Sequence, residues 1–571
     1  MKQDLLAQFR QGLVDKSLKW PSRWATKKVW MPSPFEGLLD FGPFPWLEEI
    51  VNVMEGQVSV MKGSQLGCSV VAMVKSLFTA IEMRDEAMIV QPTAQAAGLF
   101  AQSRLDAIIA TSPALRDAFP KNDSVSLKTT KFHSHIFMRG SISEAGLTSQ
   151  PVSVAIIDEF DRCNINCLAL IKKRMSARSL AQRHVFVLST PILPEMGIDQ
   201  QFREGTQERF VFDCPGCSRG ITLEWPESVE IIGASPDDPR CAESYFKCQH
   251  CGHKLDIDER ALDPKYKNEF LMKPWLSTAR WEANAEAQYH RSFYIPQMYG
   301  PKITAGEMVV ESIKAEANEA EKVQFVNQSL GLPYVMEGAK LSNEIINRCI
   351  GDHHLTDDPP VEGGRMIVMG IDVGTMLDCV VTEYIYTRDP GFEPHLASVA
   401  KVLQVRRIPG GDWGQLGNLM RDYSIEHAVI DFQPETTMAR AFANEFYGGV
   451  SLCQYRKGTQ QLDINCKVGD DKVSLLTVDR TSFLDMALGR FHKQQVIIPV
   501  DTGYVFKEHL CNLTRTYEYD ENNRPKAKYV TPPNKADHLA HAYTLGEVAH
   551  MRAYAKRSGR SIGNDDSIRD F

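Results

Sequence analysis

Short apolar runs alternate with amphipathic stretches between residues 35 and 205, the pattern of parallel strands joined by helices. The four runs expected to form buried strands are EGQVSVMKG (55–63), EAMIVQPT (86–93), SVAIIDEFD (153–161) and RHVFVLSTP (183–191). Each run ends in a polar or glycine-containing loop, and ligands bind at this edge of such sheets. The pattern therefore predicts an α/β domain on a parallel sheet.

A second α/β pattern starts at Arg365 and runs to about residue 550. It opens with a strand, a glycine turn and another strand, and it closes with an amphipathic helix. PPVEGG at 359–364 has the composition of a linker. The pattern divides the chain into a basic lead-in (1–34), a first α/β domain (35–205), an insertion (206–260), a connecting subdomain and linker (261–360), a second α/β domain (361–550) and a flexible tail (551–571).

The run VSVMKGSQLGCSVVAMVKSLF predicts a strand, a glycine-containing loop and a helix. A standard phosphate loop reads GxxxxGK[ST], and Cys68 stands here at the lysine position. An ordinary strand-to-helix turn is the alternative interpretation. However, Lys62 at the loop entrance could fold back to the phosphates, and Ser69 could place a hydroxyl on Mg²⁺. The residues expected to contact nucleotide here are Lys62, Gly63, Ser64, Gln65, Gly67, Cys68 and Ser69.

Two further motifs follow at the ends of later strands. Asp158 and Glu159 end a buried apolar run, where two carboxylates are costly unless they have a role. In a nucleotide hydrolase the first holds Mg²⁺ and the second activates the attacking water. Ser189, Thr190 and Pro191 end the next run. In motor ATPases such a hydroxyl pair senses the γ-phosphate and couples hydrolysis to motion. Their order along the chain favours this interpretation over a solvated strand end or a simple turn.

Four cysteines form a CxxC…CxxC array, with each pair on a glycine-bearing turn; these are Cys214, Cys217, Cys248 and Cys251. Four thiolates give a closed, tetrahedral and structural Zn²⁺ site. Chance pairing of free thiols is the alternative interpretation. Cys241 lies outside the array.

Three acidic residues are spread over the second α/β domain. Asp372 ends its first strand, Asp431 ends a later strand, and Asp537 opens the last helix. Clustered carboxylates suit a nuclease that holds two Mg²⁺ or Mn²⁺ ions about 3.5–4 Å apart. Asp378 follows Asp372 by one short turn and could support either ion. A solvated aspartate after a strand is the alternative for each residue taken alone.

Composition leaves the partner open. The net charge is −8, which does not itself indicate nucleic acid, although basic residues can gather on one face. The 13 cysteines and the charged N-terminal segment without a signal-peptide stretch favour reduced thiols and a cytoplasmic protein. No apolar run is long enough to span a bilayer, so no membrane partner is expected.

The order of these motifs resembles the large terminase subunit of tailed phages, and most of all its lambda-type (GpA-like) branch. In that branch the lysine precedes the loop glycine, as in MKGSQLGCS, and a cysteine ribbon follows the ATPase. A stretch similar to FVNQSLGLPY at 325–334 is also present. The resemblance covers about residues 35–550. It implies a RecA-like P-loop ATPase domain, a zinc-ribbon insertion and an RNase H-like nuclease domain.

The resemblance also implies roles. Lys62, Gly67 and Ser69 would bind phosphates, with ATP as the substrate. Asp158 and Glu159 would act as metal ligand and general base. The nuclease ions would be held by Asp372, Asp431 and Asp537. The last motif departs from the family, because His541 stands where many relatives have aspartate. The third ligand therefore stays open between Asp537, His538 and His541.

Two more family features have no single assignment in the sequence. The segment FGPFPWLEEI, where an adenine-binding glutamine is expected, has no glutamine. The arginine finger has four candidates, Arg104, Arg139, Arg174 and Arg178.

The family implies ATP-driven translocation of double-stranded viral DNA into a procapsid and endonucleolytic cutting of concatemeric DNA. Its expected partners are a small terminase subunit, the portal and further copies of this chain, in the host cytoplasm and not retained in the virion. One alternative is a helicase–nuclease of repair or restriction, although no second RecA domain follows the STP motif. Another is a non-catalytic DNA-binding scaffold, which Cys68 favours and the intact Asp158–Glu159 pair opposes.

Overall fold

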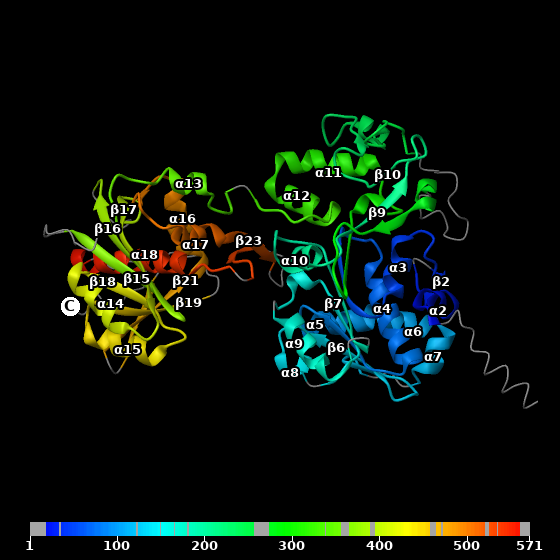
Figure 1. Ribbon diagram of the computed structural model, residues 1–571, viewed down its shortest axis with the longest axis horizontal. Helices are drawn as coiled ribbons and strands as arrows, with labels where there is room; N and C mark the ends of the chain where they lie inside the picture. The colour runs from blue at the N-terminus through cyan, green and yellow to red at the C-terminus, as the bar shows by residue number, and fades with distance from the viewer. Residues whose placement is uncertain are drawn as a thin grey trace, which may run out of the picture. The chain divides into compact units, whose positions relative to one another are not determined.

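The computed structural model describes most of the chain (Figure 1). The described residues are 19–559, apart from 34–35, 121–123, 149, 165, 180–181, 256–272, 337, 356–364, 389–393, 457–463, 470–471, 520–524 and 534. The linker expected at 359–364, the first 18 residues of the lead-in and the last 12 residues of the tail lie outside them. The chain forms two compact units, Met1–Tyr334 and Val335–Phe571. Among the described helices, none is long and apolar enough to cross a membrane.

The first unit is built on a ten-stranded mixed sheet. Its central strands run parallel, as the apolar runs predicted, and antiparallel strands complete both edges. In spatial order the strands are β10 (Gly220–Ile221), β9 (Glu208–Asp213), β14 (His290–Ile295), β3 (Gly56–Lys62), β8 (His184–Ser189), β7 (Val154–Asp158), β4 (Ala87–Gln91), β6 (His135–Gly140) and β5 (Leu127–Thr129), with β13 (Arg280–Glu282) paired to β9. The predicted α/β class is confirmed.

Helices cover this sheet and supply its loops. They include α2 (Pro21–Lys28), α3 (Trp46–Asn52), α4 (Cys68–Phe78), α5 (Ala94–Phe100), α6 (Asp106–Thr111), α7 (Pro113–Ala118), α8 (Glu144–Thr148), α9 (Cys167–Arg174), α10 (Gly197–Glu204), α11 (Ala305–Ala317) and α12 (Glu319–Gln324). Helix α4 packs against β4 and β7. Nine of its eleven side chains are buried, which explains why its sequence is apolar on nearly every face.

The sheet extends beyond the first predicted domain, because β9 and β14 lie after residue 205. Strand β14 inserts between β9 and β3 and runs parallel to both. It comes from the segment that the pattern assigned to a connecting subdomain. The register aligns Ile295 with Lys62, so the chain leaving β14 passes directly beside the phosphate loop.

The second unit contains an eight-stranded mixed sheet. In spatial order its strands are β20 (Ile464–Val468), β21 (Ser474–Asp479), β19 (Val450–Arg456), β18 (His427–Asp431), β15 (Met366–Val373), β16 (Met376–Tyr386), β17 (Ser398–Pro409) and β22 (Val496–Ile497). A separate hairpin pairs β23 (Thr514–Tyr519) with β24 (Pro525–Val530). The helices are α13 (Asn343–Asn347), α14 (Trp413–Asp422), α15 (Thr436–Glu445), α16 (Arg480–His492), α17 (Tyr504–Asn512) and α18 (His538–Ser558).

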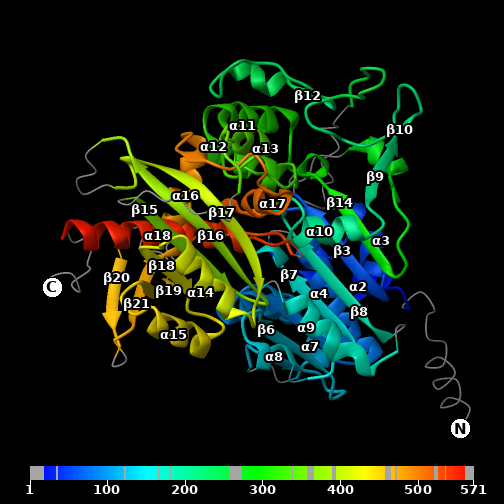
Figure 2. The ribbon, with the colours of Figure 1, turned by 60° about the vertical axis from the view of Figure 1, so that its left-hand side comes forward.

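Alternate residues of β15 face different helices. Ile367 and its odd-numbered neighbours share a core with α14 and α15, whereas Met366 and Val368 share a core with α16 and α18. Helix α18 crosses the sheet against β15, β16 and β18, and Figure 2 shows it along these strands. Gly370 permits this approach, since a Cβ there would lie 2.0 Å from the carbonyl oxygen of Ala542. Asp372 belongs to the same face of β15 and is thereby brought to the start of α18.

Candidate nucleotide, metal and nuclease sites

The loop between β3 and α4 is held closely by its neighbours. The N–H of Gly63 donates to the carbonyl of Ile295 at 2.9 Å. A Cβ on Gly63 would lie 2.8 Å from the backbone nitrogen of Gln297, so only glycine fits. Gly67 has φ 77 and precedes the first turn of α4. The loop and its helix start therefore have the form of a phosphate-binding turn, with backbone N–H groups available at the helix N-terminus.

Cys68 cannot replace the missing lysine of this loop. Its side chain is buried, and the Sγ donates to the carbonyl of Leu66 at 3.9 Å. Burial raises the pKa of the thiol to about 11, although the charge of nearby Lys62 acts to lower it. Lys62 itself reaches back over the loop, with its Nζ 3.5 Å from the carbonyl oxygen of Gly63. Among the loop residues, Lys62 alone carries a positive charge.

Two side chains that are far apart in sequence meet at the end of α4. The hydroxyl of Ser69 donates to Asp158 Oδ2 at 3.1 Å, across a sequence separation of 89 residues. Gln91, at the end of β4, donates to the same oxygen at 3.4 Å. Asp158 is 5% exposed. P-loop hydrolases hold Mg²⁺ with this combination, a loop Ser or Thr and a strand-end Asp.

Glu159 adopts the left-handed conformation, with φ 53. Such a backbone is strained for a residue with a side chain, and strain of this kind is found at functional sites. Its carboxylate is half-exposed and lies 3.6 Å from the guanidinium of Arg162. The geometry leaves Glu159 directed outward while Asp158 faces the loop.

The STP residues form a loop that is tied to the DE motif. Asp161 accepts hydrogen bonds from the N–H groups of Ile192 at 2.9 Å and Ile198 at 2.7 Å. Its own N–H donates to the hydroxyl of Ser189 at 3.2 Å. Burial raises the pKa of the Asp161 carboxyl to about 7. We call residues 189–192 the coupling loop.

The four candidate arginine fingers occupy different settings. Arg178 forms two hydrogen bonds of 2.7 Å with Asp85. Arg139 donates to two backbone carbonyls, and Arg104 lies over the ring of Phe100. Arg174 ends α9. None of these contacts places an arginine beside the phosphate loop of its own chain.

The four cysteines of the insertion come together. Their sulfurs all lie within 4.8 Å of one another. The sulfurs of Cys214 and Cys251 are 3.8 Å apart, and those of Cys217 and Cys248 are 3.9 Å apart. A tetrahedral Zn²⁺ with Zn–S bonds of about 2.3 Å requires sulfurs roughly 3.8 Å apart, so the cluster fits this ion. Cys241 remains outside the cluster, as expected.

In the second unit, Asp372 lies beside two other candidate residues. His538, the first residue of α18, has its Nδ1 2.8 Å from Asp372 Oδ2. This hydrogen bond raises the pKa of His538. Asp378 lies directly opposite Asp372 in the β15–β16 pair, and paired residues project on one face of a sheet. Asp378 is buried and accepts from Arg407 Nε at 2.6 Å.

The other two aspartates differ in environment. Burial, followed by the charge of Asp372, raises the pKa of Asp431 to about 6. Burial also acts to raise the pKa of Asp537, but a hydrogen bond and charge from His541 and a hydrogen bond from Thr531 lower it strongly. The hydroxyl of Thr531 donates to Asp537 Oδ2 at 2.6 Å, and His541 Nε2 lies 3.5 Å from the same oxygen.

These residues approach one another without forming a closed ligand shell. Within the described part of the chain, the cysteines form the one group of three or more potential ligands whose atoms lie within 4.8 Å of each other. Asp372 and Asp431 influence each other's charge, while Asp372, Asp378 and Asp537 are each bonded to a histidine or arginine. The site therefore has the expected residue types, with its carboxylates bonded to neighbouring cationic groups.

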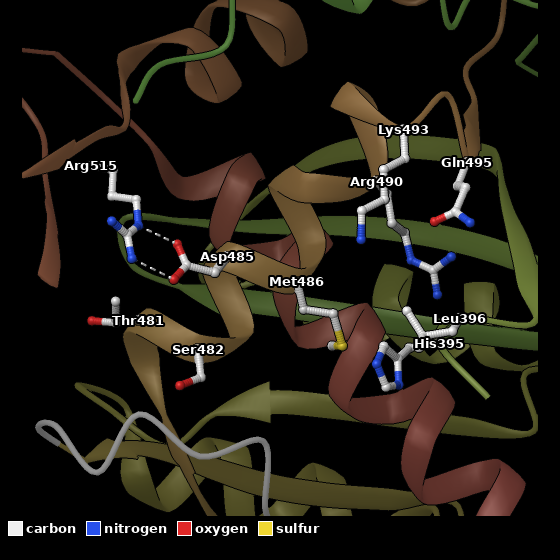
Figure 3. Close-up of a pocket in the computed structure, with 10 residues that line it drawn as sticks. All are labelled: His395, Leu396, Thr481, Ser482, Asp485, Met486, Arg490, Lys493, Gln495 and Arg515. Atoms are coloured by element: carbon white, nitrogen blue, oxygen red, sulfur yellow. Dashed lines mark hydrogen bonds and ion pairs between the residues drawn. The ribbon is translucent and has the colours of Figure 1, made fainter. Parts of the chain in front are cut away.

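A separate cavity of about 460 Å³ lies beside α16 (Figure 3). Arg515 and Asp485 form an ion pair in its wall, at 2.8 and 3.1 Å. Arg490 contributes to another part of the wall, and its Nε lies 2.6 Å from Glu547. The residues that line this cavity do not include the predicted nuclease carboxylates.

Several residues at these sites were not predicted from the sequence. Asp161 could have been found, because it places a third carboxylate in DEFD. Gln297 and Arg407 carry no motif, since only the pairing of distant strands brings them to the sites. Gln328 lies in the FVNQSLGLPY stretch, but nothing in that stretch shows which loop it touches.

Comparisons with known proteins give distant similarities to solved structures and one family match. The large terminase of bacteriophage HK97 shares 10% identity, covers 93% of this chain and 99% of its own, and has a TM-score of 0.47. The large terminase of a thermophilic bacteriophage, solved in complex with ADP, shares 11% identity over 88% and 96%, with a TM-score of 0.27. The large terminase nuclease from thermophilic phage G20c shares 13% identity over 36% and 95%, with a TM-score of 0.24. No curated protein matches the chain.

The family comparison is more direct. Residues 33–266 match the family model described as phage terminase large subunit gpA, ATPase domain. The matched segment contains the phosphate loop, the Asp158–Glu159 pair and the coupling loop. It also includes all four clustered cysteines. The match supports a role in phage DNA packaging. Over residues 33–266, the chain is thus confirmed as similar to the ATPase domain of the phage terminase large subunit gpA.

Proposed function

We propose that this protein is a DNA-packaging motor in which an ATPase unit and a metal-dependent endonuclease unit occupy one chain. The contact between Ser69 and Asp158 carries the proposal. Those two side chains are the ones that hold the Mg²⁺ of bound nucleotide in P-loop hydrolases. They come from different strand–loop units and meet beside a helix N-terminus suited to phosphate.

In the ATPase unit, Lys62 takes the place of the missing loop lysine. It neutralises the β- and γ-phosphates, which Cys68 cannot do because its thiol is buried and neutral. The loop residues Gly63, Ser64, Gln65 and Gly67 approach the phosphates through their backbone. Glu159 accepts the proton of the attacking water. The coupling loop, with Ser189 and Thr190, responds to the γ-phosphate and moves with Asp161.

In the nuclease unit, the RNase H-like arrangement uses Asp372, Asp431 and Asp537 to hold two Mg²⁺ or Mn²⁺ ions. The ions would stabilise the attacking and leaving oxygens of the phosphodiester. Asp378 and His541 support this set. His538 and Arg407 occupy the carboxylates in the structure described, and both would have to yield when metal and DNA bind. The raised pKa of Asp431 fits a carboxylate whose charge needs a cation beside it.

The insertion is proposed to be a structural zinc ribbon. Its two CxxC turns bring four sulfurs to distances that suit tetrahedral Zn²⁺. Thiolate ligands on all four corners leave no open position, so this ion would stabilise the insertion and take no part in hydrolysis.

The partners follow from the proposed function. The substrate is concatemeric double-stranded viral DNA in the host cytoplasm. A small terminase subunit would deliver the DNA, and the portal of the procapsid would receive a motor made of several copies of this chain. A neighbouring copy would then supply the arginine that the site of one chain lacks.

A paired assay of the purified full chain tests the proposal. ATP hydrolysis and plasmid cleavage are measured on one preparation, with Mg²⁺, with Mn²⁺ and with a chelator. We expect both activities with metal and neither after chelation. Ser69→Ala is expected to lower ATP hydrolysis strongly and to leave cleavage intact. Ser103→Ala, on a helix away from the loop, is the matched control. A chain that hydrolyses no ATP under any of these conditions would contradict the proposal.

A further inference from the structure

The last stretch of the first unit lies against both loops of the nucleotide site. It comprises the π-helical turn η11 (Phe325–Ser329) and the extended residues that follow it, up to Tyr334. We call residues 325–334 the bridge segment. π-helical turns are rare and occur often at functional sites. None of the roles proposed above includes this segment.

On one side the bridge segment holds the phosphate loop by its backbone. The N–H of Ser64 donates to the carbonyl of Gln328 at 2.7 Å. Gly331 has φ +66, and a Cβ there would lie 2.5 Å from the backbone nitrogen of Gly63. The two backbones are therefore in direct contact, and movement of one requires movement of the other.

On the other side the same residues hold the coupling loop. The side-chain amide of Gln328 donates to the hydroxyl of Thr190 at 3.4 Å. The amide of Asn327 donates to the carbonyl of Ile192 at 3.3 Å, and the N–H of Tyr334 donates to that carbonyl at 3.2 Å. Because Asp161 binds the N–H of Ile192, the coupling loop lies between the DE motif and the bridge segment.

Asn327 adds a second observation. It is 5% exposed, and its Oδ1 has no hydrogen-bond partner among the described residues. Buried acceptors are nearly always satisfied, so one left open in this arrangement favours a second arrangement in which a donor meets it. The N–H groups of the coupling loop are the nearby donors that a shift of this loop would bring.

We propose that Gln328 is a positioning residue for ATP hydrolysis. Its backbone fixes the phosphate loop at Ser64 while its side chain fixes Thr190, so the two loops stay in register when the γ-phosphate is bound. The inference rests on the proposed function and extends it to a residue outside the recognised motifs. Gln328 does not touch the reacting atoms; it acts through Thr190.

Gln328→Met is the main test, because methionine keeps the length of the side chain and its backbone contact but cannot donate. We expect kcat for ATP to fall about 10- to 100-fold, as misplaced catalytic groups do. The KM for ATP should change by no more than about twofold, because the phosphate loop is retained. Gln324→Met, at the exposed end of α12, is the matched control and should keep the wild-type kcat. Thermal melting should be the same for all three proteins.

A double-mutant cycle with Thr190→Val separates this role from a general loss of packing. If Gln328 acts through Thr190, the double variant should be no slower than Thr190→Val alone. Wild-type kcat in Gln328→Met, or effects of the two substitutions that add, would overturn the inference. If Gln328→Met does not fold, the role is structural and the inference also fails. Loss of ATP hydrolysis by the wild type would instead contradict the proposed function, so the two failures are distinguishable.

Discussion

The nucleotide site of the first unit and the carboxylate site of the second differ in how complete they are. Ser69 and Asp158 already touch in the first, beside a loop held by Ile295 and Gln297. In the second, Asp372 and Asp378 are bonded to His538 and Arg407. A parallel sheet brings the ends of its strands to one edge, which assembles the first site without any ligand. Four carboxylates repel one another, so the second is expected to close only when cations bind.

The largest effect is expected from Glu159→Gln, which keeps the size of the side chain and removes its basicity. ATP hydrolysis should fall by about 10²–10⁴-fold, the usual cost of losing a general base. Nucleotide binding and plasmid cleavage should be retained. Steady-state hydrolysis is measured beside Glu144→Gln, an exposed control in the same unit. Unchanged turnover would remove Glu159 from the mechanism.

Asp372→Asn should weaken the second site alone. The amide can still pair with His538, but it loses the charge that holds a divalent ion, so cleavage should fall by about 10²–10³-fold. ATP hydrolysis should be unchanged. Asp422→Asn, exposed at the end of α14, controls for the loss of one negative charge. Cleavage at the wild-type rate would disprove the nuclease assignment.

Gly370→Ala should disturb the position of α18 against β15. Its Cβ would meet the backbone of Ala542 and Gly546, which no side-chain rotation relieves. We expect the free energy of unfolding of the second unit to fall by about 1–3 kcal/mol. Gly489→Ala is the control, because its Cβ meets nothing within 4 Å and alanine favours a helix by about 0.5–1 kcal/mol. Denaturation of both variants should give changes of opposite sign.

The smallest effect on activity is expected from the cysteine cluster. Purified wild-type protein should carry about one zinc per chain. Cys248→Ser should lose this metal and melt at a lower temperature, while Cys241→Ser, in the same insertion but outside the cluster, should keep it. Elemental analysis gives the result directly. A wild-type protein purified without chelators and free of metal would contradict the zinc proposal.

Local patterns predicted the α/β class and the order of the motifs, because apolar runs and strand-end polar residues are local features. The CxxC pairs were equally visible, and the structure brings their sulfurs together. The pairing of β14 with β3 was not predictable, since it joins segments more than 200 residues apart across the insertion. For the same reason the sequence did not show that Gln297 and Gln328 contact the phosphate loop, or that Arg407 binds Asp378.

The central claim is that the first unit binds and hydrolyses ATP with Lys62 in place of the usual loop lysine. Lys62→Ala tests it most directly, with ATP hydrolysis and plasmid cleavage measured on one preparation beside Lys27→Ala in α2. The account predicts that Lys62→Ala loses most ATP hydrolysis, because no other loop residue carries a positive charge, and that it still cuts DNA. Wild-type ATP hydrolysis in Lys62→Ala would contradict it.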